Sequence, residues 1–312
     1  MLFRLILGVF LLTAGGCSRQ RTSVAVDAAL LTQVPGDTVA LGAMRVKALR
    51  STAAWKKLLE QPQVNAQLEK LAVETSFDAR KDLWEVLWST NGKDTLVYAR
   101  GEFAELGLEP KIDREGVQRL NYKGSMLLGN AENAVWFVNS STAVYGKTET
   151  LHALIDGRGN GKPGPPVALR ERIDKLPPNA HFWMVADAAA MPKLPEARGG
   201  GAMNVLQNLP MILRSVQMVT MDVSLTDGMF LEASAFCDGE QGAKQVHDSL
   251  RGIVGLARLT LPGPQKQALL PLLDAVEVVQ KQTETTMRAR LTVEQFENMQ
   301  TALTAVAGKK AN

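Results

Sequence analysis

Residues 84–99 read WEVLWSTNGKDTLVYA, two apolar segments of alternating polarity on either side of Asn91-Gly92. Asn-Gly is typical of tight β-hairpin turns, because both residues tolerate the positive φ that such turns demand. A second run of this kind, VTMDVSLTDGMFLEA at residues 219–233, turns at Asp227-Gly228. The sequence therefore predicts two antiparallel hairpins, one in each half of the 312-residue chain.

The segments upstream of the two hairpins also match each other. Residues 34–41 (VPGDTVAL) align without gaps on residues 176–183 (LPPNAHFW). In both segments a proline turn with a short polar residue begins an apolar strand. Turn chemistry, order and approximate spacing agree between the halves, so the sequence predicts an internal duplication.

Short strands are expected between the first hairpin and the middle of the chain. They are residues 117–122, 125–128, 134–138 and 143–145, and a helix follows at 148–155. Short connections make sequential strands antiparallel neighbours. In the second half, Glu284–Leu291 alternates as a half-buried strand does. Thr292 and Gln295 then have the spacing of a capping box, which predicts the start of a last helix.

Apolar residues recur at helical spacing in both halves, and such faces pack on a sheet. They are Val64, Leu68, Leu71 and Ala72 in the first half, Ala243, Val246, Leu250, Ile253, Val254 and Ala257 in the second, and Val293, Phe296, Leu303 and Val306 near the C-terminus. The predicted fold class is α+β, with two related modules, each a mainly antiparallel sheet with helices packed on one face.

The expected modules span residues 34–157 and 176–312, and residues 158–175 are the expected linker. A glycine- and proline-rich run, GRGNGKPGPP at residues 157–166, favours the linker interpretation. A phosphate-binding loop would need a strand before its glycines and a helix N-terminus after them. Here a predicted helix precedes the glycines and prolines follow them, so the sequence does not predict a phosphate site.

The N-terminus has the pattern of a secretory signal. An apolar run at residues 5–12 follows Arg4 and is too short to span a bilayer, and small residues follow it. The box Ala14-Gly15-Gly16-Cys17 resembles the lipobox of bacterial lipoproteins, although that family usually has Leu where Ala14 stands. An ordinary cleaved signal with an incidental cysteine is the alternative.

The lipoprotein resemblance implies a processed and acylated N-terminus. Residues 1–16 would be the signal peptide, and Cys17 would carry a diacylglycerol thioether with acyl chains such as palmitate. Residues 17–33 would form a tether between the membrane and the folded part. The tether is polar and lacks periodicity at Ser18–Ser23. The implied location is the cell envelope, facing the periplasm. Ser18, where retained lipoproteins have Asp, favours the outer membrane.

The mature chain also resembles uncharacterised exported bacterial proteins with a duplicated strand–helix module. The residues that carry this resemblance are Pro35-Gly36-Asp37-Thr38 and Pro177-Pro178-Asn179-Ala180. The resemblance implies no activity and transfers no catalytic residue.

The charge pattern argues against nucleic acid as a partner, and the cysteine content of the acylated chain excludes an intramolecular disulfide bond. The 35 basic and 32 acidic residues are interleaved, which leaves no electrostatic footprint for nucleic acid. With Cys17 acylated, Cys237 has no cysteine to pair with, and its apolar surroundings predict a buried structural thiol.

The sequence predicts no catalytic residue, metal site or cofactor. It contains neither a Gly-x-Ser-x-Gly elbow nor a His-Glu-x-x-His motif, and its three histidines are scattered. Trp84, Trp88 and Trp136 are the candidate ligand-binding residues, since aromatic side chains line many ligand pockets. Ordinary burial between helix and sheet is the alternative for all three.

Three classes of function remain open. The first is a non-enzymatic, membrane-tethered binding or assembly protein of the periplasm with an envelope protein as partner. The second is a carrier or sensor that holds a small apolar ligand between sheet and helices, and an enzyme comes third. A pocket of several hundred cubic ångströms lined by the candidate tryptophans would favour the carrier, whereas a large exposed apolar patch would favour assembly.

Overall fold

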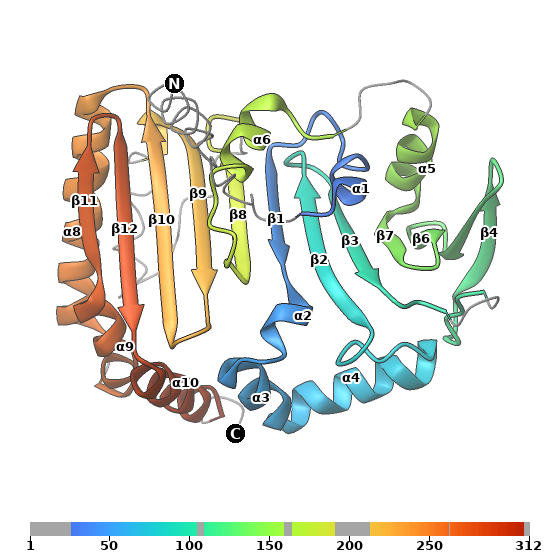
Figure 1. The fold of residues 1–312 in the computed structure, drawn as a ribbon, viewed down its shortest axis with the longest axis horizontal. Helices are drawn as coiled ribbons and strands as arrows, with labels where there is room; N and C mark the ends of the chain where they lie inside the picture. The colour runs from blue at the N-terminus through green and yellow to red at the C-terminus, as the bar shows by residue number, and fades with distance from the viewer. Residues whose placement is uncertain (1–25, 105–108, 159–163, 191–212, 262, 309–312) are drawn as a thin grey trace, which may run out of the picture.

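The computed structural model describes residues 26–104, 109–158, 164–190, 213–261 and 263–308 and has an α+β fold (Figure 1). The strands are β1 (Ala40–Met44), β2 (Leu83–Thr90), β3 (Thr95–Gly101), β4 (Gln118–Tyr122), β5 (Ser125–Gly129), β6 (Asn133–Asn139), β7 (Thr142–Lys147), β8 (Phe182–Asp187), β9 (Val216–Ser224), β10 (Met229–Cys237), β11 (Glu277–Lys281) and β12 (Glu284–Leu291). Within the described residues they form one sheet of 12 strands in the order β11-β12-β10-β9-β8-β1-β2-β3-β7-β6-β5-β4.

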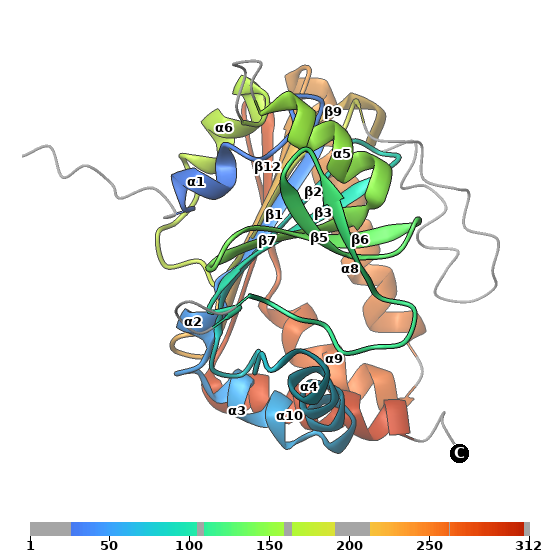
Figure 2. The same ribbon diagram turned by 90° about the vertical axis from the view of Figure 1, so that its right-hand side faces the viewer.

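Helices flank the sheet on both faces and lie along one end of its strands. They are α1 (Ala28–Leu31), α2 (Val46–Leu49), α3 (Ala53–Glu60), α4 (Pro62–Thr75), α5 (Thr148–Gly157), α6 (Val167–Ile173), α8 (Glu240–Thr260), α9 (Gly263–Ala275) and α10 (Val293–Gly308). Figure 2 shows α1 and α6 on one side of the central strands and α8 on the other. In the part of the chain that the structure describes, no helix has the length and hydropathy of a membrane span.

The strand order repeats on either side of the central pair β1–β8. Outward from β1 it runs β2, β3, β7 and β6, and outward from β8 it runs β9, β10, β12 and β11. At the centre Gly42 pairs with Met184, its counterpart when the alignment of the two halves is continued. This symmetry supports the duplication. The division into two modules stays a prediction, because both halves belong to one sheet.

The two halves bury opposite faces of that sheet. In the first half Leu41, Leu87 and Tyr98 share a core with residues of α1, α5 and α6. Side chains alternate along a strand, so it is the polar Thr220 and Ser234 that continue this face into the second half. Most apolar residues of β9, β10 and β12 point the other way and form smaller clusters with α8, α9 and α10. Met218 and Phe236 are exceptions and pack in the core of the first half. Each half thus has its own helical cover, on a different face from the other.

Most of the local expectations are confirmed. Both hairpins form at the predicted turns, and all four short strands of the first half are present within a few residues of their predicted bounds. The capping box is reciprocal: the backbone N–H of Thr292 donates to Gln295 Oε1 (3.0 Å), and the N–H of Gln295 donates to Thr292 Oγ1 (3.2 Å). Cys237 is buried as expected, and burial raises the pKa of its thiol.

The expected tether and linker boundaries need correction. Leu30, which was placed in the tether, is fully buried in the main core. The second part of the expected linker forms α6, whose Leu169 and Ile173 are each 1% exposed in the same core. Residues 163–166, three prolines and one glycine, are typical of a turn, but the apolar residues that follow them form a helix. A short apolar helix gains its stability from packing, which composition does not show.

The expected apolar face of α4 does not cover the sheet. None of the side chains of α4 is buried, and Leu71 and Val73 are 37% and 79% exposed. The helix packs against α3 instead. Helical spacing of apolar residues identified the helix correctly, but spacing does not say which element lies opposite that face.

A buried carboxyl group lies on the polar face of the second half. Asp222 on β9 is 5% exposed, and its cross-strand neighbour Glu232 accepts a hydrogen bond from Arg288 Nε (2.6 Å). The pKa of Asp222 is raised to about 7, mainly by burial and also by the negative charge of Glu232, while Arg288 acts in the opposite direction. Asp222 is therefore partly protonated in the fold near neutral pH.

Asp222→Asn is expected to weaken the pH dependence of stability. The folded chain holds a proton on Asp222 that the unfolded chain has already lost, so the free energy of unfolding falls as the pH rises from about 4 to about 7. Each unit of pKa difference is worth about 1.4 kcal/mol. Urea unfolding at pH 5 and pH 8 measures the change. Glu115→Gln, at an exposed carboxylate, should leave the pH dependence as it is. An unchanged pH dependence in Asp222→Asn would contradict the role of Asp222.

Candidate functional site

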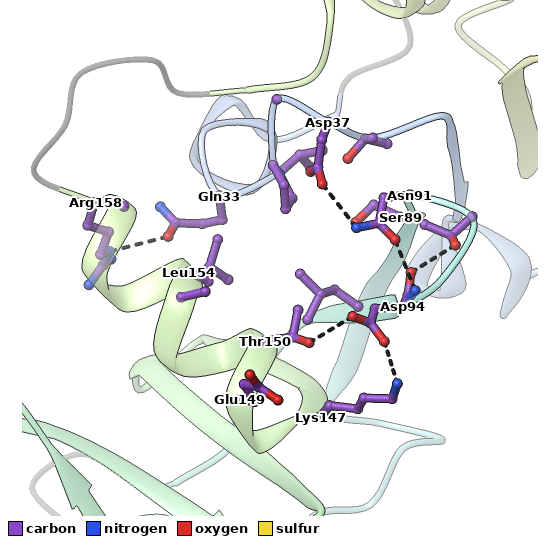
Figure 3. A pocket seen from close by; sticks show the side chains of 18 of the residues that line it. Gln33, Asp37, Ser89, Asn91, Asp94, Lys147, Glu149, Thr150, Leu154 and Arg158 are labelled. Atoms are coloured by element: carbon purple, nitrogen blue, oxygen red, sulfur yellow. Dashed lines mark hydrogen bonds and ion pairs between the residues drawn. The ribbon is translucent and has the colours of Figure 1, made fainter. Parts of the chain in front are cut away.

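A pocket of about 950 Å³ opens between α5, the β2–β3 turn and the loop that follows α1 (Figure 3). Most of its lining residues have hydroxyl, amide or charged side chains. The lining residues are Thr32, Gln33, Val34, Pro35, Gly36, Asp37, Thr38, Ser89, Thr90, Asn91, Asp94, Leu96, Lys147, Glu149, Thr150, Ala153, Leu154, Gly157 and Arg158. They come from three segments far apart in the sequence, so the pocket exists only in the folded chain. We refer to it as the α5 pocket.

Hydrogen bonds within the β2–β3 turn shape one wall of the α5 pocket. Asn91 Oδ1 accepts hydrogen bonds from the backbone N–H groups of Lys93 (3.1 Å) and Asp94 (2.9 Å), which holds the turn in shape. The amide of Asn91 also donates to Asp37 Oδ2 (3.0 Å). This bond joins the turn to the loop after α1. The proline turn and the Asn-Gly turn of the sequence thus meet at one rim of the pocket.

An ion pair ties the same turn to the start of α5. Asp94 Oδ1 lies 2.5 Å from Lys147 Nζ, and the hydroxyl of Thr150 donates to Asp94 Oδ2 (3.3 Å). The bond from Lys147 is the main reason why the pKa of Asp94 lies below its usual range. Asp94 therefore stays ionised at neutral pH, and its charge is matched by Lys147.

The opposite end of the α5 pocket carries a second cation. Arg158 Nε donates to Gln33 Oε1 (3.3 Å), and the guanidinium lies 4.6 Å from the centroid of the Trp136 ring. Neither contact neutralises the charge of Arg158. Figure 3 shows Arg158 and Gln33 at one end of the pocket and the pair of Asp94 and Lys147 at the other.

The floor of the α5 pocket rests on a buried hydroxyl network. The phenol of Tyr98, which is fully buried, donates to the carbonyl oxygen of Gln33 (3.3 Å) and lies 3.3 Å from Ser89 Oγ. Burial raises the pKa of Tyr98 far above neutrality, so this group stays protonated. The network fixes the backbone at Gln33 and gives the pocket a rigid base.

The chemistry of the α5 pocket suits the binding of a polar molecule. Its lining offers hydrogen-bond donors and acceptors on several sides, including the carboxylates of Asp37 and of Glu149, the latter in electrostatic interaction with Lys147. Neither histidine nor cysteine is among the lining residues. Across the described parts of the chain, no group of three or more His, Cys, Asp or Glu side chains is arranged to hold a metal ion.

The structure does not bring the three candidate tryptophans together. Trp84 lines a second, smaller pocket, and Trp88 packs against Phe182 in a tilted arrangement with ring centroids 5.3 Å apart. Trp136 is 1% exposed and belongs to the main core below Arg158. Neither of the two pockets has more than one of them in its lining. In the sequence, the residues of the α5 pocket are recognisable only as parts of the predicted proline turn, hairpin and helix.

The three histidines lie in different elements and settings. His152 on α5 stacks on Tyr122 with centroids 3.7 Å apart, and His247 on α8 lies 2.9 Å from Asp248 Oδ1. His181, just before β8, is buried and accepts a hydrogen bond from the N–H of Leu225 (3.1 Å). Burial lowers the pKa of His181. Each histidine therefore makes local contacts within the fold. The remaining predicted site residue, Cys17, lies outside the described residues.

Fold and pocket together define an α+β protein with one extended antiparallel sheet and a polar pocket under α5. No protein-family model and no curated protein matches the sequence. Among solved structures, crystal form III of TP0453 aligns with a TM-score of 0.49 at 8% identity, over 87% of this chain and 97% of that one. Crystal form I of TP0453 aligns with a TM-score of 0.47 at 9% identity, over 88% of this chain and 96% of that one.

Proposed function

We propose that this chain is a lipid-anchored, non-enzymatic binding protein of the cell envelope that holds a polar small molecule in the α5 pocket. One observation carries the proposal: a pocket of about 950 Å³ lined by converging polar side chains from three segments. Ligand sites are concave, largely preformed and supplied with a few placed polar groups. The anchor and the location rest on the resemblance at Cys17.

The lining of the α5 pocket favours a polar ligand over an apolar one. Apolar atoms, including those of Val34, Leu96 and Leu154, provide more than half of the pocket surface, and charged or hydrogen-bonding groups from all three segments lie among them. An apolar ligand would leave these polar groups without water or partners, which costs free energy. A ligand with hydroxyl, amide or charged groups would instead replace the hydrogen bonds to water.

Assembly with an envelope protein is the second candidate function. The observation that favours it is the exposure of large apolar side chains on two helices. Leu256 and Leu259 on α8 are 48% and 77% exposed, and Val73 on α4 is 79% exposed. Partner-binding surfaces often expose apolar side chains in this way.

Ala153→Trp is expected to abolish ligand retention by filling the α5 pocket. Ala153 lines the pocket on α5 and is exposed, so the indole has room to enter the pocket without disturbing the core. Native mass spectrometry of the full chain, extracted gently from its own membrane, should show a bound small molecule on the wild type and none on the variant. Ala66→Trp places the same side chain on the exposed face of α4 and is the matched control.

Two results would overturn the ligand proposal. One is a wild-type chain that carries no small molecule and instead co-purifies with a protein, which would favour the assembly function. The other is retention of the ligand by Ala153→Trp and the control alike, which would place the ligand elsewhere in the chain.

A further inference from the structure

A second pocket, of about 340 Å³, lies where β1 runs into α2, beside the start of β2 and the end of β3. Its lining residues are Asp27, Arg45, Lys47, Ala48, Trp84, Glu85 and Arg100. It shares no lining residue with the α5 pocket. Three cationic side chains, two carboxyl groups and one indole are thus gathered in a small volume. We refer to it as the Arg45 pocket.

The cations of the Arg45 pocket are not all neutralised. Arg100 forms an ion pair with Asp27, and its guanidinium lies 5.9 Å from the centroid of the Trp84 ring. Arg45 Nη1 donates to a neutral group, the carbonyl oxygen of Pro178 (2.6 Å). Lys47 is exposed and has no ion pair among the described residues. Arg45 and Lys47 therefore leave positive charge in the pocket.

The remaining carboxyl group, Glu85, is in an unusual position. Its Oε1 is buried and has no hydrogen-bond partner within the described chain. Burial raises the pKa of Glu85 to about 7; Arg45 and Arg100 act to lower it, and Asp27 acts to raise it. These groups and Lys47 are the charges that face Glu85 from the neighbouring elements. His181 also interacts electrostatically with Arg45, and burial lowers the pKa of this histidine, so its ring adds little charge at pH 7.

We propose that the Arg45 pocket binds a small organic carboxylate, with Arg45 and Lys47 holding the carboxylate group and the indole of Trp84 contacting its apolar part. A guanidinium and an ammonium are the side chains that recognise carboxylates, and the guanidinium does so with two parallel hydrogen bonds. A volume of about 340 Å³ accommodates a molecule of the size of an aromatic acid. This proposal is independent of the ligand of the α5 pocket.

The position of Glu85 adds a pH dependence to this site. A bound anion beside Glu85 disfavours its ionised form, so binding takes up a proton. Binding therefore tightens as the pH falls from 8 to 6, provided that the ligand itself stays ionised. Replacement of Glu85 by glutamine mimics the protonated side chain and removes this linkage.

Calorimetric titration of the full chain with benzoate at pH 6 and pH 8 tests the proposal. We expect tighter binding at pH 6. Lys47→Gln and Arg45→Gln should each weaken binding by about tenfold, in the range of one charged hydrogen bond. Glu85→Gln should bind benzoate equally at both pH values and at least as tightly as the wild type at pH 6. Lys56→Gln, at an exposed lysine of α3 outside the pocket, is the control and should bind like the wild type.

Several outcomes would overturn the carboxylate site. The first is no detectable heat with benzoate while inorganic phosphate binds tightly, which would assign the cations to a phosphate group. The second is benzoate binding that Lys47→Gln leaves unchanged. Because Lys47 is exposed, this variant should fold normally, so the test does not depend on Arg45, whose side chain also holds the backbone at Pro178. If benzoate binding by Glu85→Gln kept the pH dependence of the wild type, Glu85 would not be the group that couples binding to pH.

Discussion

Gly228→Ala is expected to destabilise the fold by at least about 3 kcal/mol, whereas Gly124→Ala should cost only about 1–2 kcal/mol, the strain of an L-residue in a left-handed conformation. Both glycines have positive φ, of 99° at Gly228 and 81° at Gly124. They differ in what a Cβ atom would meet. At Gly124 nothing lies within 4 Å. At Gly228 the new atom would lie 2.1 Å from the carbonyl oxygen of Leu291 and 2.9 Å from the backbone nitrogen of Val293.

The neighbours of Gly228 are backbone atoms and cannot rotate away. They belong to the end of β12 and the first residue of α10, so the clash is relieved only if the β9–β10 hairpin or the start of α10 moves. Such a shift would also disturb the cluster of Met229, Leu291 and Met299. Thermal and urea unfolding of the two variants followed by circular dichroism measures the difference. Equal losses in both would show that the turn and α10 do not pack as closely as described.

Cys17→Ala is expected to abolish labelling by a fatty-acid probe and to release the protein from the membrane fraction. An acyl chain contributes about 0.8 kcal/mol per buried methylene, and stable anchoring requires more than one chain. Loss of the thioether would remove that entire contribution, while the fold of the described residues stays the same. Metabolic labelling followed by fractionation measures both effects.

Cys237→Ala is the matched control for the acylation site. The chain has two cysteines, and Cys237 is buried on β10, where burial keeps its thiol protonated and inaccessible. The control should label with the fatty-acid probe like the wild type. Continued labelling of Cys17→Ala would refute the lipoprotein proposal, and labelling lost from both variants would point to a failure of export or folding.

The local structure of this protein was predictable because its signals lie within a few residues of one another. Asn91-Gly92 and Asp227-Gly228 specify hairpins through the φ values that they tolerate, and both hairpins form. Thr292 and Gln295 specify a helix start through two reciprocal hydrogen bonds, and both bonds are present. The α+β class followed from such elements, since each depends on turn chemistry or on periodicity within one segment.

The site and the position of the core depended on contacts between distant residues. Arg158 and Gln33 are 125 residues apart, and Asp94 meets Lys147 only because β3 and β7 are neighbours in the sheet. Likewise, alternation along β9 and β10 showed that one face would be apolar, but which face of the common sheet that is depends on the pairing of β8 with β1 and β9. Periodicity encodes the two faces of a single strand, whereas strand pairing and helix docking decide which side chains share a pocket or a core.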